Sequence, residues 1–240
     1  MPLDRHLVEA FGGAAPGHYR WQTEAPGVAA AERALVQAAF LPLGRRLLDL
    51  GCAEGATLRH LDDPAGAVGL DIFPAKLAFA RGQVRAQVVA GSATALPFAA
   101  GAFDQVLVRD VIHHVPDAEG LLAECRRVLA PGGRVDVLEP SRYNPLILAH
   151  ALSQPAERGE LRSTPAFLAR LVGRHFRRCT VTHHQPLPLH RLLFHPRFGV
   201  GGAAGSARLR KAVEAAERLA GWLVPKVAWA YVHVRGEDAS

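Results

Sequence analysis

Two glycines and an aspartate are spaced as in a cradle for a small ligand. Gly51 and Gly55 bracket a turn in "LLDLGCAEGATLRHL", residues 47–61, between an apolar run and a helical pattern. Glycine allows positive φ and close approach of the backbone to a ligand, and the first amides of the following helix are free to bind an electron-rich group. Asp71 follows Gly51 by 20 residues, where an acid at a strand end accepts hydrogen bonds from a ribose diol. The same carboxylate could instead cap the helix that begins near Pro74, so both roles stay open.

A second group of residues could move protons. His113 and His114 follow a strand pattern in "DVIHHVPD", and histidine titrates near neutral pH. Glu139 ends the next strand pattern, which should reach the same edge of a sheet. We take His114, His113 and Glu139 as candidate catalytic residues for a reaction in which an acceptor loses a proton. The alternatives are structural: the histidines would pack against or bond the next loop, and Glu139 would pair with Arg142.

The remaining histidines and the cysteines do not indicate a metal centre. Four C-terminal histidines have no carboxylate or cysteine companion at ligand spacing: His183, His184, His190 and His195. The three cysteines are far apart and form no CxxC pair: Cys52, Cys125 and Cys179. An odd, scattered set argues against a disulfide framework and a cysteine-rich zinc site. The sequence therefore predicts no metal site.

The elements that must position these groups alternate between strand and helix. After a helix at 26–41, strand patterns lie at 47–50, 67–72, 86–93, 103–112 and 134–140, with helices at 74–82 and 118–133 between them. A helix at 163–176 and two alternating stretches at 177–184 and 227–236 follow. This rhythm predicts an α/β fold with a doubly wound, mostly parallel, seven-stranded Rossmann-like sheet and an antiparallel last strand.

Length and local composition predict a single domain with inserts. At 240 residues, we expect one domain over 1–240, with an N-terminal helical segment at 1–44 and a cofactor-binding core at 45–140. Inserts at 141–162 and 185–225 fall on the expected ligand side. In the second insert, "GVGGAAG" suggests a hinge and 206–226 a helix, so we expect a C-terminal lid. That helix should pack by one stripe: Leu209, Val213, Ala216, Leu219 and Leu223.

The composition of the chain limits the classes of molecule that the protein is expected to bind. Hydrophobic residues make up 49% and charged residues 21% of the chain, which is ordinary for a soluble globular protein. No apolar run reaches the length of a membrane span and the start lacks a signal pattern, so we expect a cytoplasmic protein. The net charge of +6 comes mainly from scattered arginines, which makes nucleic acid an unlikely partner. The oligomeric state does not follow from the sequence.

The ordered set of motifs resembles the class I S-adenosylmethionine-dependent methyltransferases, and among them the group acting on quinones and other small molecules. The motifs are "LLDLGCAEG", "VGLDI", "GSATALPFAAGAFDQVLVRDVIHHVPD" and "RVLAPGGRVDVLEP", which together cover about residues 45 to 140. The resemblance implies the Rossmann-like fold and S-adenosyl-L-methionine as cofactor. Any single glycine turn would be a weak signal, whereas the ordered set is specific.

The resemblance also implies roles for individual residues. Asp49, Gly51 and Gly55 would hold the methionine end of the cofactor, with backbone contributed by two neighbours, Cys52 and Ala53. Asp71 would hold the ribose and Ile72 would pack on adenine, and Arg109 would line the methionine moiety. Ala53 replaces the family's usual third glycine, and Ser92, next to Ala93, replaces an acid that accepts from the adenine amino group. A serine oxygen accepts more weakly than a carboxylate, so adenine contacts should differ.

The resemblance implies methyl transfer to a small-molecule acceptor, with an apolar or quinone-like compound as one option. Arg191 and Arg197, in the leucine-rich and phenylalanine-rich insert, would suit an apolar substrate with an anionic group. Two alternatives stay open: a methyltransferase that modifies RNA, and a protein that binds S-adenosylmethionine or a nicotinamide dinucleotide without transferring methyl. The sequence lacks the Asn-Pro-Pro-aromatic motif of DNA amine methylation, and it does not identify the acceptor atom.

Overall fold

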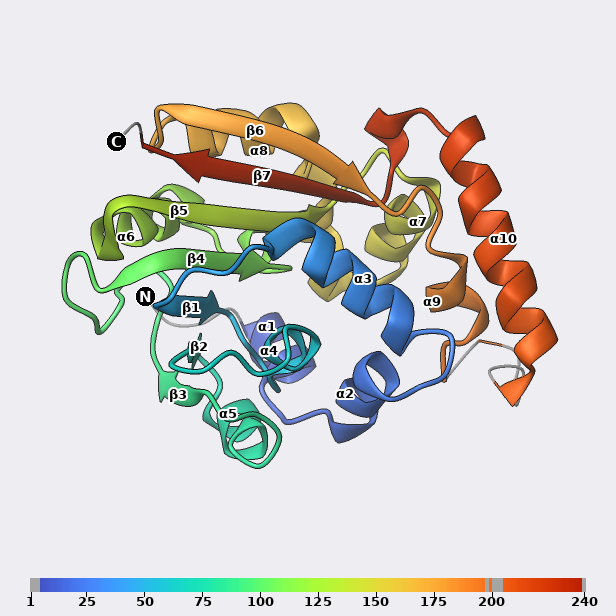
Figure 1. The fold of residues 1–240 in the computed structure, drawn as a ribbon, viewed down its shortest axis with the longest axis horizontal. Helices are drawn as coiled ribbons and strands as arrows, with labels where there is room; N and C mark the ends of the chain where they lie inside the picture. Colours follow the sequence, from blue (N-terminus) through green and yellow to red (C-terminus); the bar gives the residue numbers. More distant parts are fainter. Residues whose placement is uncertain (1–4, 197–198, 200–204, 239–240) are drawn as a thin grey trace.

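The computed structural model describes residues 5–196, 199 and 205–238, and over these ranges seven strands form one sheet (Figure 1). The strands are β1 (Leu47–Leu50), β2 (Val68–Asp71), β3 (Gln87–Ala90), β4 (Phe103–Arg109), β5 (Leu129–Pro140), β6 (Arg178–His184) and β7 (Tyr231–Glu237). Their order is β3-β2-β1-β4-β5-β7-β6. Strand β7 runs antiparallel to both of its neighbours and the other pairs are parallel. The predicted sheet with an antiparallel last strand is confirmed.

Helices cover both faces of this sheet. The helical elements are α1 (Arg5–Phe11), α2 (Pro16–Thr23), α3 (Ala29–Phe40), α4 (Ala56–His60), α5 (Pro74–Ala80), η1 (Ile112–His114), α6 (Ala118–Val128), α7 (Pro145–Ser153), η2 (Pro155–Arg162), α8 (Pro165–Gly173), α9 (Leu189–Leu193), α10 (Ala207–Leu223) and η4 (Lys226–Ala228). Residues of α6 and α8 pack on one face. Residues of α3 and α4 pack on the other.

The central strands form because their side chains are apolar on both sides. Leu48 and Leu50 join the core under α6 and α8, whereas Leu47 joins the core under α3 and α4. In β4, Val106 and Val108 share the first core and Leu107 the second. A strand buried on both faces needs such a continuous apolar run. The parallel arrangement then brings the carboxyl ends of β1, β2 and β4 to one edge.

Several predicted boundaries differ from the structure, and the strands predicted at 86–93 and 103–112 end early, at Ala90 and Arg109. Helix α6 ends at Val128, and β5 begins at Leu129 rather than at residue 134. The segment holding Pro131 and Gly132 lies within β5 at a register shift against β4, and Gly132 has a φ of 75°. A bulge accommodates a proline that cannot donate to the ladder. The last strand begins at Tyr231 because η4 occupies part of the predicted stretch.

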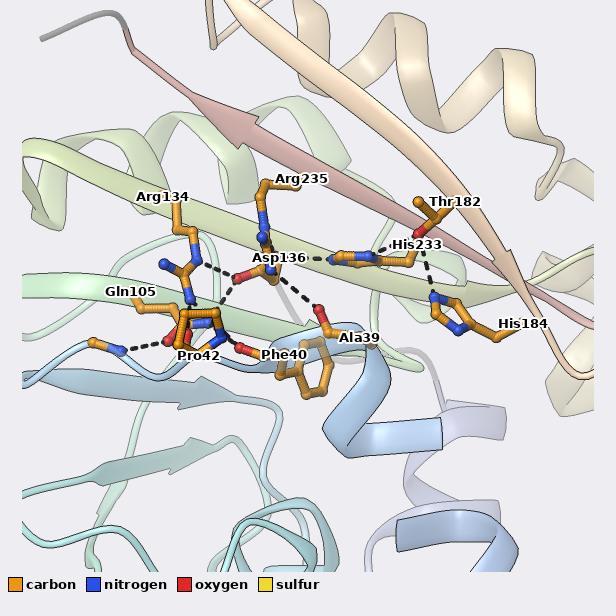
Figure 2. Close-up of polar contacts among 11 residues, drawn as sticks. Ala39, Phe40, Pro42, Gln105, Arg134, Asp136, Thr182, His184, His233 and Arg235 are labelled. Carbon is orange, nitrogen blue, oxygen red and sulfur yellow. Dashed lines mark hydrogen bonds and ion pairs between the residues drawn. The ribbon is translucent and has the colours of Figure 1, made fainter. Parts of the chain in front are cut away.

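A buried polar network fastens α3 to the sheet (Figure 2). Asp136 of β5 has no exposed surface and accepts from four side chains: Gln105 at 2.7 Å, Arg134 at 3.0 Å, His233 at 2.9 Å and Arg235 at 2.6 Å. Gln105 and Arg235 also donate to the carbonyls of Phe40 and Ala39. The last carbonyls of a helix lack partners within it, and these donors satisfy them. The network therefore fixes the position of α3.

Candidate active site at the carboxyl edge of the sheet

The glycine turn between β1 and α4 has the backbone that the sequence predicts. Gly51 has a φ of 77° and Gly55 a φ of 90°, a region that side chains rarely adopt. A Cβ at Gly51 would lie 2.3 Å from the Cγ2 of Val111, in the loop after β4. The amides of Gly51 and Cys52 donate to the carbonyl of Leu70 in β2. The turn is thus held against the ends of β2 and β4.

Asp71 ties two loops of this edge together. Its carboxylate accepts from the amide of Ala53 and from the amide of Phe73, each at 2.9 Å. Phe73 is the N-cap residue of α5 and has no side-chain cap, so Asp71 steadies the start of α5 without occupying the cap position. Burial raises the pKa of Asp71, and its two backbone hydrogen bonds oppose that rise. Each carboxylate oxygen keeps a further lone pair for a ligand hydroxyl.

Ala53, the residue that replaces the family's usual glycine, has a φ of 47°. An L-residue in this left-handed region is destabilised by roughly 1–2 kcal/mol. We expect Ala53→Gly to raise the free energy of unfolding by about 1 kcal/mol, after the greater entropy of glycine in the unfolded chain is subtracted. Urea unfolding of parent and variant measures this difference in the free energy of unfolding. Ala78→Gly, at an exposed position inside α5, is the matched control and should lower the free energy of unfolding by about 0.5–1 kcal/mol. Equal losses in both variants would contradict the prediction.

Asp49 and Arg109 each keep a buried polar atom without a hydrogen-bond partner among the described residues. In Asp49, which is 1% exposed, this atom is Oδ2. Burial raises the pKa of Asp49 to about 7, with Arg109 opposing and Asp71 adding to the shift. In Arg109 the atom is Nε, which forms an ion pair with Asp110 at 3.4 Å but no hydrogen bond. A buried acceptor and a buried donor without hydrogen bonds are costly unless a ligand supplies those bonds.

The other predicted cofactor residues line the same loops. Ile72 directly follows β2 and has 38% of its surface exposed, as an apolar wall for a flat ring requires. Ser92 bonds the amide of Thr94 at 3.2 Å and its hydroxyl at 3.0 Å, so its oxygen already stabilises the loop after β3. Ala93 packs against the core. Cys52 is buried, and its sulfur lies 2.7 Å from where a Cβ of Gly69 would be.

The turn itself contains an ion pair that no sequence pattern indicated. Glu54 is 5% exposed and lies 3.2 Å from the Nζ of Lys76 in α5. The same carboxylate accepts from the amide of Ala15, just before α2, at 2.8 Å. Tyr19 of α2 also contacts Phe79 of α5 edge to face. Helix α2 is therefore fastened over the turn. The acidic residue Glu54 within the glycine motif could have indicated an ion pair, but the sequence does not show its partners because Lys76 and Ala15 are distant along the chain.

The candidate proton-transfer residues meet beyond β4. The Nδ1 of His113 lies 2.6 Å from Glu139, which also accepts from the amides of Val111 and Ile112. Glu139 is thus paired with His113, while Arg142 donates to the carbonyl of Leu161. Burial alone would lower the pKa of His113, but Glu139 and Glu157 outweigh it and raise that pKa well above its usual value.

His114 differs from its neighbour in charge. Its Nε2 lies 3.6 Å from Glu157, its Nδ1 has no partner among the described residues, and its ring contacts Phe11 of α1. Burial, reinforced by the charge of His113, lowers the pKa of His114 to about 4. His114 is consequently neutral at pH 7 and can accept a proton.

Glu157 comes from η2 in the first insert, and no sequence pattern singled it out. A Cβ at Gly159 would lie 1.8 Å from the carbonyl oxygen of His113, so only glycine allows η2 this close to η1. Among the described residues, His113, His114 and Glu157 each offer a ligand atom within 4.8 Å of the other two. The two carboxylates keep a proton on His113, however, and imidazolium has no lone pair for a metal ion.

A buried ion cluster attaches the second insert to the site. Glu32 of α3 has no exposed surface and accepts from Arg109 at 2.6 Å and from two nitrogens of Arg191 in α9 at 2.7 Å. His190 lies 3.4 Å from Glu32 and 2.7 Å from Glu217 of α10. Burial would raise the pKa of Glu32, but Arg191, His190 and Arg109 hold it well below its usual range. This cluster joins α3, β4, α9 and α10.

The predicted packing stripe of α10 is wrong in part. Val213 and Ala220 are buried and Leu209 is half-buried, but Ala216, Leu219 and Leu223 are exposed. The packed stripe runs through Leu209, Val213, Glu217 and Ala220 because Glu217 binds His190. Trp21, Val28 and Phe194 complete this contact. Arg197 and residues 200–204 of the proposed hinge lie outside the described residues.

Residues 48–136 match the methyltransferase domain family. A demethylmenaquinone methyltransferase of Thermus thermophilus is 38% identical over 115 residues, 45% of this chain and 52% of that protein. A norajmaline N-methyltransferase of Rauvolfia serpentina is 33% identical over 109 residues, 42% of this chain and 37% of that protein. The chain spans only about half or less of the length of these curated relatives.

Solved structures extend the similarity of fold to almost the whole chain. A Thermotoga maritima S-adenosylmethionine-dependent methyltransferase, described as a possible histamine N-methyltransferase, has a TM-score of 0.69 at 20% identity, covering 98% of this chain and 99% of its own. A Haemonchus contortus phosphoethanolamine N-methyltransferase in complex with S-adenosylmethionine has a TM-score of 0.63 at 19% identity, covering 92% and 56%. Residues 48–136 thus match a methyltransferase domain, and the chain has the fold of S-adenosylmethionine-dependent methyltransferases.

Proposed function

We propose that this protein transfers a methyl group from S-adenosylmethionine to a small-molecule acceptor in the cytoplasm. The observation that carries the proposal is the pair of unsatisfied buried atoms, Asp49 Oδ2 and Arg109 Nε, beside the glycine turn. The methionine end of the cofactor has a cationic amino group and a carboxylate, which are the groups that such an acceptor and donor would pair. In this proposal residues 1–240 form one domain, and the acceptor binds on the side of that domain that carries the two inserts, residues 141–162 and 185–225.

The other residues of the edge fit the rest of the cofactor. Asp71 would accept from the ribose hydroxyls with the lone pairs that its two backbone bonds leave free. Ile72 would pack on adenine, with Ser92 and Ala93 beside the ring. When bound, the cofactor supplies an electrophilic methyl group. The protein must then orient the acceptor in line with that methyl and exclude water.

His114 would accept the proton of the acceptor, and His113 and Glu139 would position it. His114 is neutral, whereas His113 is committed to two carboxylates. The named relatives act on demethylmenaquinone and norajmaline, so hydrophobic ring compounds are the first acceptors to test. The leucine-rich α9 and α10 next to Arg191 favour an apolar acceptor over a nucleic acid.

The experiment is methyl transfer from labelled S-adenosylmethionine to a panel of quinols, alkaloid-like amines and total RNA, read by mass spectrometry. We expect methylation of a quinol or an amine. Transfer to RNA that weakens steeply with salt would favour the RNA-modifying alternative. Binding of the cofactor without transfer to any class, or tighter binding of a nicotinamide dinucleotide, would favour the non-catalytic alternative.

Replacing Asp71 by Ala is expected to weaken S-adenosylmethionine binding by about 1.5–3 kcal/mol, the range for a hydrogen bond to a charged group. Calorimetry with the cofactor and with S-adenosylhomocysteine measures both dissociation constants. The matched control is Asp104→Ala, which removes a carboxylate paired with Arg46 at the start of β4. It should leave cofactor affinity unchanged. An Asp71 variant that is less stable but binds equally well would show that Asp71 only supports the two loops.

A further inference from the structure

The outward side of α10 carries large apolar side chains that the rest of the described chain does not cover. Trp222 is 89% exposed, Leu223 72%, Leu219 59% and, in the following η4, Val227 51%. Leu219, Trp222 and Leu223 are spaced three and four residues apart and so share one face of the helix. We call these four residues the outer face of α10. Grouped exposed apolar side chains of this size mark an interaction surface.

The charges around this face are basic. Arg218 and Lys226 are exposed beside it, and the sequence contains no Asp or Glu from residue 218 to residue 236. The acids of α10, Glu214 and Glu217, lie at earlier turns, and Glu217 is bonded to His190. Tryptophan and leucine flanked by basic residues are the composition of segments that lie in the interface of an anionic membrane.

The position of α10 links this face to the site. Figure 1 shows α10 along one edge of the molecule, with α9 between it and α3. The inner side of α10 holds His190 through Glu217, and α9 holds Glu32 through Arg191. The helix that carries the outer face is therefore joined to the Glu32 cluster at the site through α9. None of the described helices is long and apolar enough to span a bilayer, so contact with lipid would be with the surface.

We propose that the outer face of α10 docks on an anionic lipid bilayer, with Trp222 and Leu223 among the upper acyl chains and Arg218 and Lys226 over the headgroups. Docking would bring the site, through α9 and α10, next to the phase in which an apolar acceptor dissolves. The proposal deepens the proposed function and rests on it for its purpose. The docking itself is independent of methyl transfer and can be measured without cofactor or acceptor.

The test is flotation of the full chain with vesicles of phosphatidylcholine alone or with 30% phosphatidylglycerol, on the order of the anionic content of natural surfaces. We expect binding to the anionic vesicles, with a blue shift of tryptophan emission that Trp222→Phe removes. The double variant Trp222→Ser with Leu223→Ser should bind at least about tenfold more weakly. Arg218→Gln and Lys226→Gln should each weaken binding roughly fivefold, and salt should weaken it further.

Leu152→Ser is the matched control, because Leu152 is 62% exposed on α7, outside this face, and it should bind like the parent. Absence of vesicle binding at low salt, or equal binding of parent and double variant, would overturn the proposal. So would a stable dimer without lipid that the double variant abolishes, because the face would then be an interface between copies. Loss of methyl transfer with intact vesicle binding would instead count against the proposed function alone.

Discussion

Replacing Glu32 by Gln is expected to lower the free energy of unfolding by about 3–5 kcal/mol, the cost of breaking a buried ion pair by removing one partner. The amide keeps the shape of the side chain but leaves Arg109 and Arg191 without their carboxylate. Both arginine side chains are mostly buried, so water cannot replace the lost partner. Because α9 is held to α3 through this carboxylate, the variant should also loosen α9, which hydrogen exchange of residues 189–193 would detect.

The stability that Glu32 contributes should fall as the pH becomes acidic. The folded state holds the pKa of Glu32 well below its usual range. A lowered pKa contributes stability that is present above the unfolded value and is lost as pH falls through the folded value. Parent and variant should therefore differ fully at neutral pH, and the difference should shrink as pH falls below the unfolded pKa of a glutamate, about 4.3. Denaturant unfolding at several pH values measures this difference.

Arg33→Gln is the control for Glu32, because Arg33 is the next residue of α3 and pairs with Asp62 in the solvent. An exposed pair contributes about 0–1 kcal/mol, so this variant should be close to the parent. If Glu32→Gln lost no more stability than Arg33→Gln, the cluster would be screened by water and would not hold α9 to α3.

Replacing His114 by Gln is expected to lower turnover roughly 100-fold, the lower end of the range for general base catalysis, with cofactor affinity unchanged. The lower end applies because a base with a pKa of about 4 gives little driving force for proton transfer. In the parent, the contribution of His114 should be constant from neutral pH downward and be lost as pH falls through about 4. Turnover of the best acceptor from the labelled panel, measured across pH, tests both statements.

His183→Gln provides a matched substitution on β6, the strand at the edge of the sheet, and should leave turnover unchanged. Equal turnover of the His114 variant and the parent would leave His114 with a packing role against Phe11. A fall in cofactor affinity equal to the fall in turnover would place His114 in the binding of cofactor instead.

Local patterns were sufficient to predict the sheet and its carboxyl edge. The apolar runs of β1 and β4 predict strands that are buried on both faces. The alternation of strands with helices predicts that neighbouring strands run parallel, and neither inference depends on distant parts of the sequence. The positive φ of Gly51 and Gly55 follows from the same local logic, because a strand must turn at once into α4. The position of Asp71 at the end of β2 was likewise a matter of spacing along the chain.

Tertiary structure decided which charged side chains pair with each other and which side of each helix packs against the protein. Glu32 binds Arg191 across 159 residues of sequence, and no local pattern marks either as a partner of the other. In α10 two apolar stripes have helical spacing, and periodicity cannot say which of them meets the protein. The bond between Glu217 and His190 selects the stripe with Val213 and leaves Trp222 in the solvent. Sequence spacing determines which side chains share a face, but burial depends on what another segment of the folded chain brings to that face.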